Sequence, residues 1–133
     1  MCGIAGIFSA RLSPEAIQHK TTRMTQRLDH RGPDSSSFFD SENIGLGHTR
    51  LSIVDLSETG TQPFVSPDKN VTVIFNGEIY NYLFLKGTLT QRGYTFKGTC
   101  DGEVLPFLYL EHGIDFLKKI EGMFSIALYY KKK

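Results

Sequence analysis

Short apolar runs bounded by turn residues dominate the sequence and predict more strands than helices. The clearest run, at 71–75, contains only β-branched and aromatic residues, which are the types that strands favour. Similar runs predict strands at 4–8, 38–39, 44–51, 94–97 and 124–130. The last of these runs is apolar on both faces, so we expect a buried strand there.

Helical signals lie between these runs. Ser13, followed by Pro14 and an acidic residue, is typical of a helix start, because serine accepts first-turn N–H groups and proline suits the first helical position. Further helices are predicted at 81–92, at 101–112 and, as a short segment, at 116–120. Pro106 lies past the expected start of the third helix, so we expect a kink or a later start there.

The predicted order of elements is β-α-β-β-β-α-β-α-β, with a long loop at 55–69. The strands outnumber the helices and many are apolar on both faces. Two sheets stacked face to face, with helices outside them, explain both features. The 133 residues fit a single domain.

Composition and charge exclude several classes of function. The net charge of +1 provides no basic surface for nucleic acid, and no apolar run approaches the ~20 residues of a transmembrane helix. The apolar N-terminal run lacks the basic segment of a signal peptide. Cys2 and Cys100 are the two cysteines, so we expect a reduced cytoplasmic protein rather than a secreted disulfide scaffold. The histidines and cysteines show no metal-ligand spacing.

Cys2 is the main candidate for covalent chemistry. If Met1 is removed, Cys2 becomes the N-terminal residue and carries both a thiol and a free α-amine. The ordinary pKa is about 7.7–8.0 for the amine and about 8.5 for the thiol, so a base near neutrality lies within one water of a strong nucleophile. The alternative is that Cys2 is an inert small hydrophobe.

A thiol that attacks an amide carbonyl creates an oxyanion, which needs preorganised hydrogen-bond donors. Asn76 and Gly77 follow the strand at 71–75 and supply a side-chain amide and an accessible backbone N–H. The alternative is a hairpin turn, which is the commoner meaning of this dipeptide. Arg50, at an apolar strand end, and Asp101, at a helix start, are charged candidates, although Asp101 could be only an N-cap.

Six short motifs follow one another over nearly the whole chain, at 1–8 (MCGIAGIF), 31–34 (RGPD), 47–53 (GHTRLSI), 61–64 (TQPF), 76–82 (NGEIYNY) and 122–124 (GMF). Together they resemble the glutaminase domain of glutamine-hydrolysing asparagine synthetases, which are class II (N-terminal nucleophile) glutamine amidotransferases. Related branches share the start of the chain but match the later motifs less well. His30 directly precedes one of these motifs and His48 lies inside another, and we expect a polar structural role for both.

The resemblance implies an α+β sandwich of two antiparallel sheets between helices, in the order αββα. It also implies that Cys2 attacks the glutamine side-chain amide while its own α-amine moves the proton. Asn76 and the Gly77 N–H would form the oxyanion hole. Arg50 would hold the substrate α-carboxylate, which suits its planar fork, and Asp101 would hold the α-ammonium. Further glutamine contacts are implied at Leu51, Ile53, Val54 and Glu78.

The resemblance also implies an incomplete domain. In the family, further strands follow the one that resembles 124–130, and an ATP-dependent synthetase domain comes next. We therefore expect residues 1–133 to be a truncated glutaminase domain with no cofactor of its own, since ATP and Mg²⁺ belong to the synthetase domain. The expected partners are glutamine and either a synthetase domain or subunit or a second copy of the chain. Two alternatives stay open: a catalytically silent fragment that binds glutamine or a partner, and a glutaminase domain from a branch with another acceptor.

Overall fold

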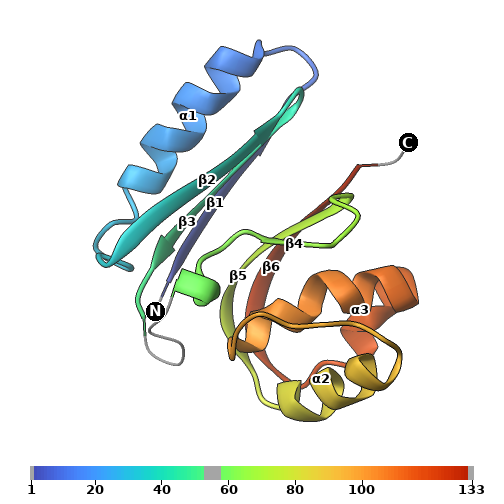
Figure 1. The fold of residues 1–133 in the computed structure, drawn as a ribbon. Helices are drawn as coiled ribbons and strands as arrows, with labels where there is room; N and C mark the ends of the chain where they lie inside the picture. The colour runs from blue at the N-terminus through green and yellow to red at the C-terminus, as the bar shows by residue number, and fades with distance from the viewer. Residues whose placement is uncertain (1, 53–57, 132–133) are drawn as a thin grey trace.

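The computed structural model describes residues 2–52 and 58–131 (Figure 1). Its elements, in which η marks a short 3₁₀ helix, are β1 (Gly3–Phe8), α1 (Pro14–Gln26), β2 (Ser35–Ser41), β3 (Ile44–Arg50), η1 (Glu58–Gly60), β4 (Phe64–Val65), β5 (Val71–Ile79), α2 (Tyr82–Gln91), η2 (Asp101–Glu103), α3 (Val104–His112), η3 (Gly113–Lys118) and β6 (Gly122–Tyr130). None of the helices among these residues is long and apolar enough to span a membrane.

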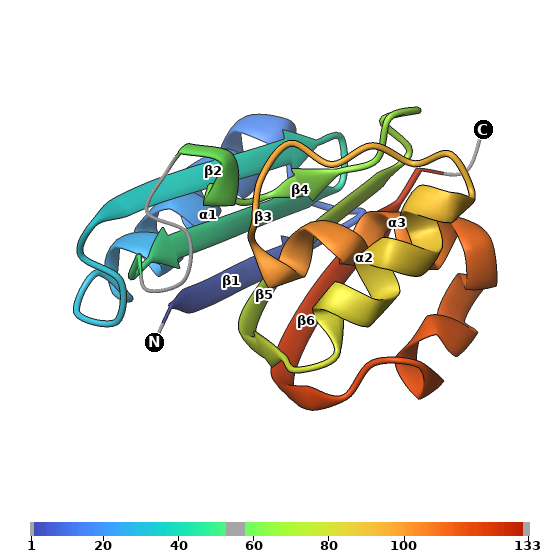
Figure 2. The same ribbon diagram turned by 60° about the horizontal axis from the view of Figure 1, so that its bottom comes forward.

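The strands form two antiparallel sheets that lie between helices. The first sheet has the order β1-β3-β2, and the second has the order β4-β5-β6. Figure 1 shows α1 on the outer side of the first sheet, and Figure 2 shows α2 and α3 over the outer face of the second. This αββα layering confirms the fold class predicted from the sequence.

Small residues let α1 pack closely against the first sheet. A Cβ at Gly47 of β3 would overlap the hydroxyl of Thr25 in α1, so the strand backbone approaches the helix too closely for a side chain. The helix starts as predicted, because the Ser13 side chain caps it. Since side chains alternate along a strand, His48 and Arg50 of β3 point to the other face, toward the second sheet.

β5 is the central strand of the second sheet and is covered on both faces. Val71, Val73 and Phe75 join the core that this sheet forms with α2 and α3. Ile74 points to the opposite face, toward the first sheet, and is fully buried there. The residues that follow Phe75 are therefore held between the two sheets.

The predicted strand end at Asn76 and Gly77 is wrong, because β5 continues to Ile79 and both residues pair with β6. Gly77 has a φ of +149°, and a Cβ there would overlap the carbonyl oxygen of Met123. The glycine is thus required by the close approach of β6 and not by a hairpin turn.

The strand predicted at 94–97 is not formed in the structure, which describes this segment completely. Tyr94 and Phe96 instead pack edge-on against Phe107 of α3, with ring centroids 5.1 and 4.9 Å away. The alternation of aromatic residues at 94–97 therefore reflects contact with a helix, which sequence periodicity does not distinguish from strand pairing in a short run.

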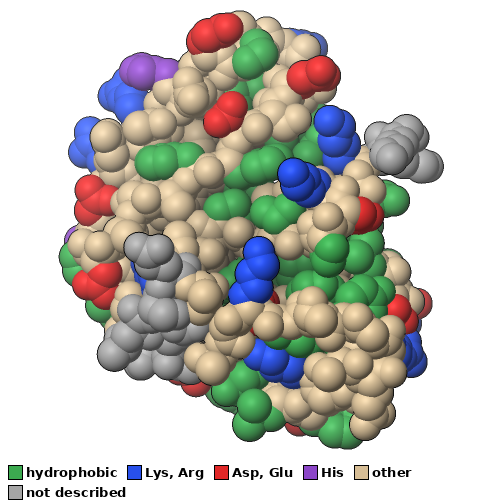
Figure 3. Space-filling model, viewed as in Figure 1, with side chains coloured by type: hydrophobic (Ala, Val, Ile, Leu, Met, Phe, Trp, Pro, Cys, Tyr) green, Lys and Arg blue, Asp and Glu red, His purple; other side chains and the backbone are tan. Residues whose placement is uncertain are grey.

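Two further predictions have opposite outcomes. α3 begins at Val104 after η2, so Pro106 falls in its first turn, in agreement with the expected later start. The buried strand predicted at 124–130 is instead an edge strand: among the described residues β6 pairs only with β5, and Met123 and Tyr130 are 52% and 45% exposed. Figure 3 shows the molecule from the side seen in Figure 1, and hydrophobic side chains lie at the surface along the middle of this view, where the two sheets meet.

Candidate active site

A pocket of about 100 Å³ lies where the two sheets approach each other. The residue before β1, the end of β3, the middle of β5 and the start of η2 all contribute to its wall. The predicted site residues that line it are Cys2, Arg50, Leu51, Asn76, Gly77, Glu78 and Asp101. The other two predicted residues, Ile53 and Val54, lie outside the described residues.

Cys2 is anchored at this pocket by the end of the first sheet. The Leu51 N–H donates to its Sγ at 3.4 Å, and the thiol donates to the Leu51 carbonyl at 3.7 Å. Arg31 Nε donates to the Cys2 carbonyl at 3.1 Å, and the next residue, Gly3, pairs with Thr49 of β3. The thiol is therefore held in place, although residues near chain ends usually fray.

β3 adds two polar side chains to the pocket wall. Arg50 is 8% exposed, and its Nη1 donates to Thr61 Oγ1 at 3.2 Å. His48 is 1% exposed, and its Nε2 has no hydrogen-bond partner among the residues that the structure describes. Burial, and to a lesser extent the Arg50 charge, lowers the pKa of His48 to about 4. The imidazole is therefore neutral near neutral pH, whereas the guanidinium carries a positive charge.

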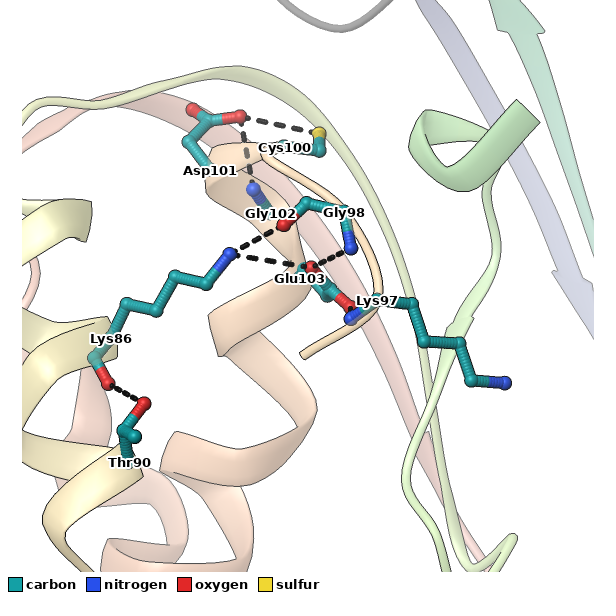
Figure 4. Close-up of polar contacts among 8 residues, drawn as sticks. All are labelled: Lys86, Thr90, Lys97, Gly98, Cys100, Asp101, Gly102 and Glu103. Atoms are coloured by element: carbon teal, nitrogen blue, oxygen red, sulfur yellow. Dashed lines mark hydrogen bonds and ion pairs between the residues drawn. The ribbon is translucent and has the colours of Figure 1, made fainter. Parts of the chain in front are cut away.

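Asp101 brings a carboxylate to the pocket from the side of the second sheet. It is 7% exposed; its Oδ2 accepts the Ile79 N–H at 2.7 Å and its Oδ1 accepts the Gly102 N–H at 2.9 Å. The Cys100 Sγ lies 3.5 Å from Oδ1 (Figure 4). Asp101 thus accepts two backbone N–H groups and lines the pocket. It is the first residue of η2, whose N-cap position is Cys100, so the N-cap interpretation is wrong. Its contact with a substrate stays a prediction.

Gln62 was not among the predicted site residues, yet it holds the strand that carries Asn76. Its Nε2 donates to the Phe75 carbonyl at 3.0 Å, and its Oε1 accepts the Phe75 N–H at 2.7 Å. The side-chain amide therefore pairs with β5 as a neighbouring strand would. The motif at 61–64 singled out the segment that contains Gln62, but it did not indicate that the side chain would bond to the Phe75 backbone. His48, expected to be structural, also belongs to the pocket wall.

The pocket combines the Cys2 thiol with charges of both signs, since Arg50 faces it together with the carboxylates of Glu78 and Asp101. A guanidinium recognises a carboxylate, and a carboxylate recognises an ammonium. Such a pair suits an amino acid in its zwitterionic form. Within the described ranges, no group of three or more His, Cys, Asp or Glu side chains could hold a metal ion.

Solved structures with the same fold include those of two enzymes. Glutamine phosphoribosylpyrophosphate amidotransferase from Bacillus subtilis is similar with a TM-score of 0.76 and 20% identity, over 98% of this chain and 35% of that one. An allosteric regulatory enzyme of purine biosynthesis is similar with a TM-score of 0.73 and 19% identity, over 96% of this chain and 35% of that one. The chain therefore has the same fold as these two enzymes.

The chain belongs to the glutamine amidotransferase domain family, whose model matches residues 1–133. It is 41% identical to asparagine synthetase (glutamine-hydrolysing) 1 of Bacillus subtilis, over 98% of this chain and 21% of that protein. It is 39% identical to asparagine synthetase B (glutamine-hydrolysing) of Escherichia coli, over 100% of this chain and 24% of that protein. The family predicted from the six motifs is confirmed, and the chain spans about a fifth to a quarter of the length of these relatives.

Proposed function

We propose that this chain hydrolyses glutamine to glutamate and ammonia, as the glutaminase part of an enzyme that resembles asparagine synthetase. The observation that carries the proposal is the arrangement of Cys2, Arg50 and Asp101 around one small pocket. A thiol, a carboxylate-binding group and an ammonium-binding group are together what a thioester mechanism on an amino-acid amide needs. The names of the relatives, which are glutamine-hydrolysing enzymes, support the same reaction.

Cys2 is the proposed nucleophile, with Met1 removed. Its α-amine accepts the thiol proton, and the sulfur attacks the side-chain amide carbon of glutamine. The C–N bond then breaks, and the leaving nitrogen takes the proton from the amine as ammonia departs. Water adds to the γ-glutamyl thioester, which releases glutamate and restores the thiol. The amine suits this work because its pKa lies near neutrality.

Asn76 and Gly77 are the proposed oxyanion donors. Both line the pocket from β5, where pairing with β6 and the Gln62 amide hold the backbone. Donors that are already in place when the charge develops are the effective ones, and one such donor is typically worth ~2.7–4 kcal/mol. This support from two sides is the structural reason to assign the role to β5.

Arg50 is proposed to bind the α-carboxylate of glutamine, and Asp101 its α-ammonium. Both side chains are more than nine-tenths buried, and charge pairing is stronger away from bulk water. Further contacts with glutamine are proposed at Leu51, Ile53, Val54 and Glu78.

Residues 1–133 are proposed to form a glutamine amidotransferase domain that delivers ammonia to a synthetase domain or subunit. The length of the relatives, of which this chain covers 18–28% in the bacterial and archaeal examples, supports a larger enzyme. ATP and Mg²⁺ would act in that other part, because the pocket described here needs neither for amide hydrolysis.

Ammonia release from glutamine tests the proposal, with intact mass confirming that Met1 has been removed. We expect release by the wild-type protein and none by Cys2→Ala. Cys100→Ala is the matched control, because it removes the other thiol of the same pocket, and we expect turnover to persist. Turnover in Cys2→Ala would refute the mechanism. Glutamine binding to the processed wild type without turnover would favour the silent, ligand-binding alternative.

A further inference from the structure

The segment that leads into Asp101 is held by a carboxylate that lies just beyond it. Residues 94–100 have no helix or strand and connect α2 to η2. Glu103 accepts the backbone N–H groups of Lys97 and Gly98, at 2.6 and 3.1 Å. Figure 4 shows its side chain directed toward this segment. Glu103 therefore ties the chain before Asp101 to the helical turn after it.

Lys86 of α2 completes this arrangement. Its Nζ donates to the Gly98 carbonyl, lies 3.8 Å from Glu103 Oε2 and stands 4.9 Å from the centre of the Phe96 ring. The Lys86 and Glu103 side chains are 23% and 12% exposed, so water screens this pair less than it screens a surface ion pair. Lys86 and Glu103, with the Gly98 peptide between them, are called the clasp below.

The clasp pairs the charge of Glu103 but not that of Asp101. The Asp101 carboxylate receives two backbone N–H groups, with the Cys100 thiol beside it, and the ion pairs of the described residues do not include it. A buried carboxylate without a cationic partner favours a cation from outside. Asp101 and Glu103 therefore differ in their environment, because Lys86 neutralises only Glu103.

Close packing transmits the geometry of the clasp to Asp101. A Cβ at Gly102 would overlap the rings of Phe64 and Phe75, so η2 rests directly on the second sheet. Asp101 reaches from this turn to the Ile79 N–H of β5. The turn is thus fixed by the sheet on one side and by the clasp on the other.

We propose that Lys86 and Glu103 are positioning residues that set the affinity of the pocket for the α-ammonium group of its amino-acid substrate, without touching that substrate. This inference rests on the proposed function, in which Asp101 receives the ammonium. Lys86→Met weakens glutamine binding by about tenfold, which is less than the ~10²-fold cost of misplacing a positioned group by 1 Å. It leaves kcat within about twofold, because Cys2 and the oxyanion donors lie on other elements.

The test is a titration of glutamine into Cys2→Ala protein, with and without Lys86→Met, so that the ligand is not consumed. The second probe is 4-carbamoylbutanoate, which is glutamine with hydrogen in place of the α-ammonium. The expected result is a tenfold rise of Kd for glutamine and an unchanged Kd for the probe. Arg92→Gln is the matched control, because it removes the ion pair between Arg92 and Glu111, which lies outside the pocket, and it leaves both values unchanged.

Equal glutamine affinity with and without Lys86→Met overturns the inference. An equal loss of affinity for glutamine and for 4-carbamoylbutanoate also overturns it, because a general structural role of Lys86 would weaken the binding of both ligands. Glu103→Gln, which keeps an accepting oxygen but removes the charge, shows the same selective loss, and Lys86→Arg restores most of the affinity. These two variants decide the matter if thermal unfolding shows that Lys86→Met is not folded. A Cys2→Ala protein that does not bind glutamine at all refutes the proposed function instead.

Discussion

His48 provides a prediction in which one buried side chain makes stability depend on pH. Its folded-state pKa is about 4, against an ordinary value of 6.5, because it is buried and lies near Arg50. Between these two pH values the unfolded chain binds a proton at His48 and the folded protein does not. Acidification therefore favours the unfolded state, and stability falls as the pH drops from about 6.5 toward about 4.

The shift is about 2.5 pKa units, and each unit is worth about 1.4 kcal/mol, so His48 costs at most about 3 kcal/mol in acid. Near pH 5 the same relation predicts a cost of about 2 kcal/mol, while carboxylates with ordinary pKa values are still largely ionised. His48→Gln, which does not titrate, removes this contribution. The other three histidines are common to both proteins, so their effects cancel in the comparison.

Urea unfolding followed by circular dichroism measures this difference directly. We expect the free energy of unfolding of the wild type to fall more steeply between about pH 7 and about pH 5 than that of His48→Gln. Over this range the difference between the two free energies should change by about 2 kcal/mol. Curves that stay parallel across this range would show that His48 titrates alike in both states. The assignment of a neutral, buried imidazole to the pocket wall would then be wrong.

Two further substitutions test the backbone that carries the proposed oxyanion donors. Gln62→Leu leaves the N–H and the carbonyl of Phe75 without their side-chain partner. We therefore expect urea denaturation to show a free energy of unfolding that is lower by about 2–4 kcal/mol. A loss below about 0.5 kcal/mol would show that these bonds do not hold β5. Gly77→Ala places a Cβ against the Met123 carbonyl and should cost about 1–3 kcal/mol, together with most of the ammonia release. Gly87→Ala is the control for Gly77→Ala, because open space surrounds that helical glycine. Alanine at position 87 should stabilise the protein by about 0.5–1 kcal/mol. Similar melting temperatures for the two variants would contradict the close packing at Gly77.

The layered fold could be predicted because each layer has a local signature in the sequence. The β-branched run at 71–75 and the Ser13-Pro14 helix start both behave as isolated-segment rules suggest. The errors at 76–77 and at 94–97 share one cause. In both places a short pattern has two meanings, and the neighbour supplied by the fold decides between them: β6 for Gly77 and Phe107 for Tyr94 and Phe96.

Where a residue type and a motif position together indicated a chemistry, as for Cys2, Arg50 and Asp101, the structure brings the predicted residues to one pocket. Their roles there stay predictions. Residues that act on other protein groups escaped prediction. Gln62 pairs with the backbone of Phe75, which is 13 positions away. Its partner becomes known only when the two segments are placed in space, since a side-chain amide has many possible partners along a sequence.

Gln62 also contacts both layers of the sandwich. Its backbone carbonyl accepts the Ser37 hydroxyl of the first sheet, while its side chain pairs with the second sheet. The proposed nucleophile is attached to one layer and the proposed oxyanion donors to the other. One residue therefore links the layer of the proposed nucleophile to the layer of the proposed oxyanion donors, so a change at Gln62 would act on the spacing between them.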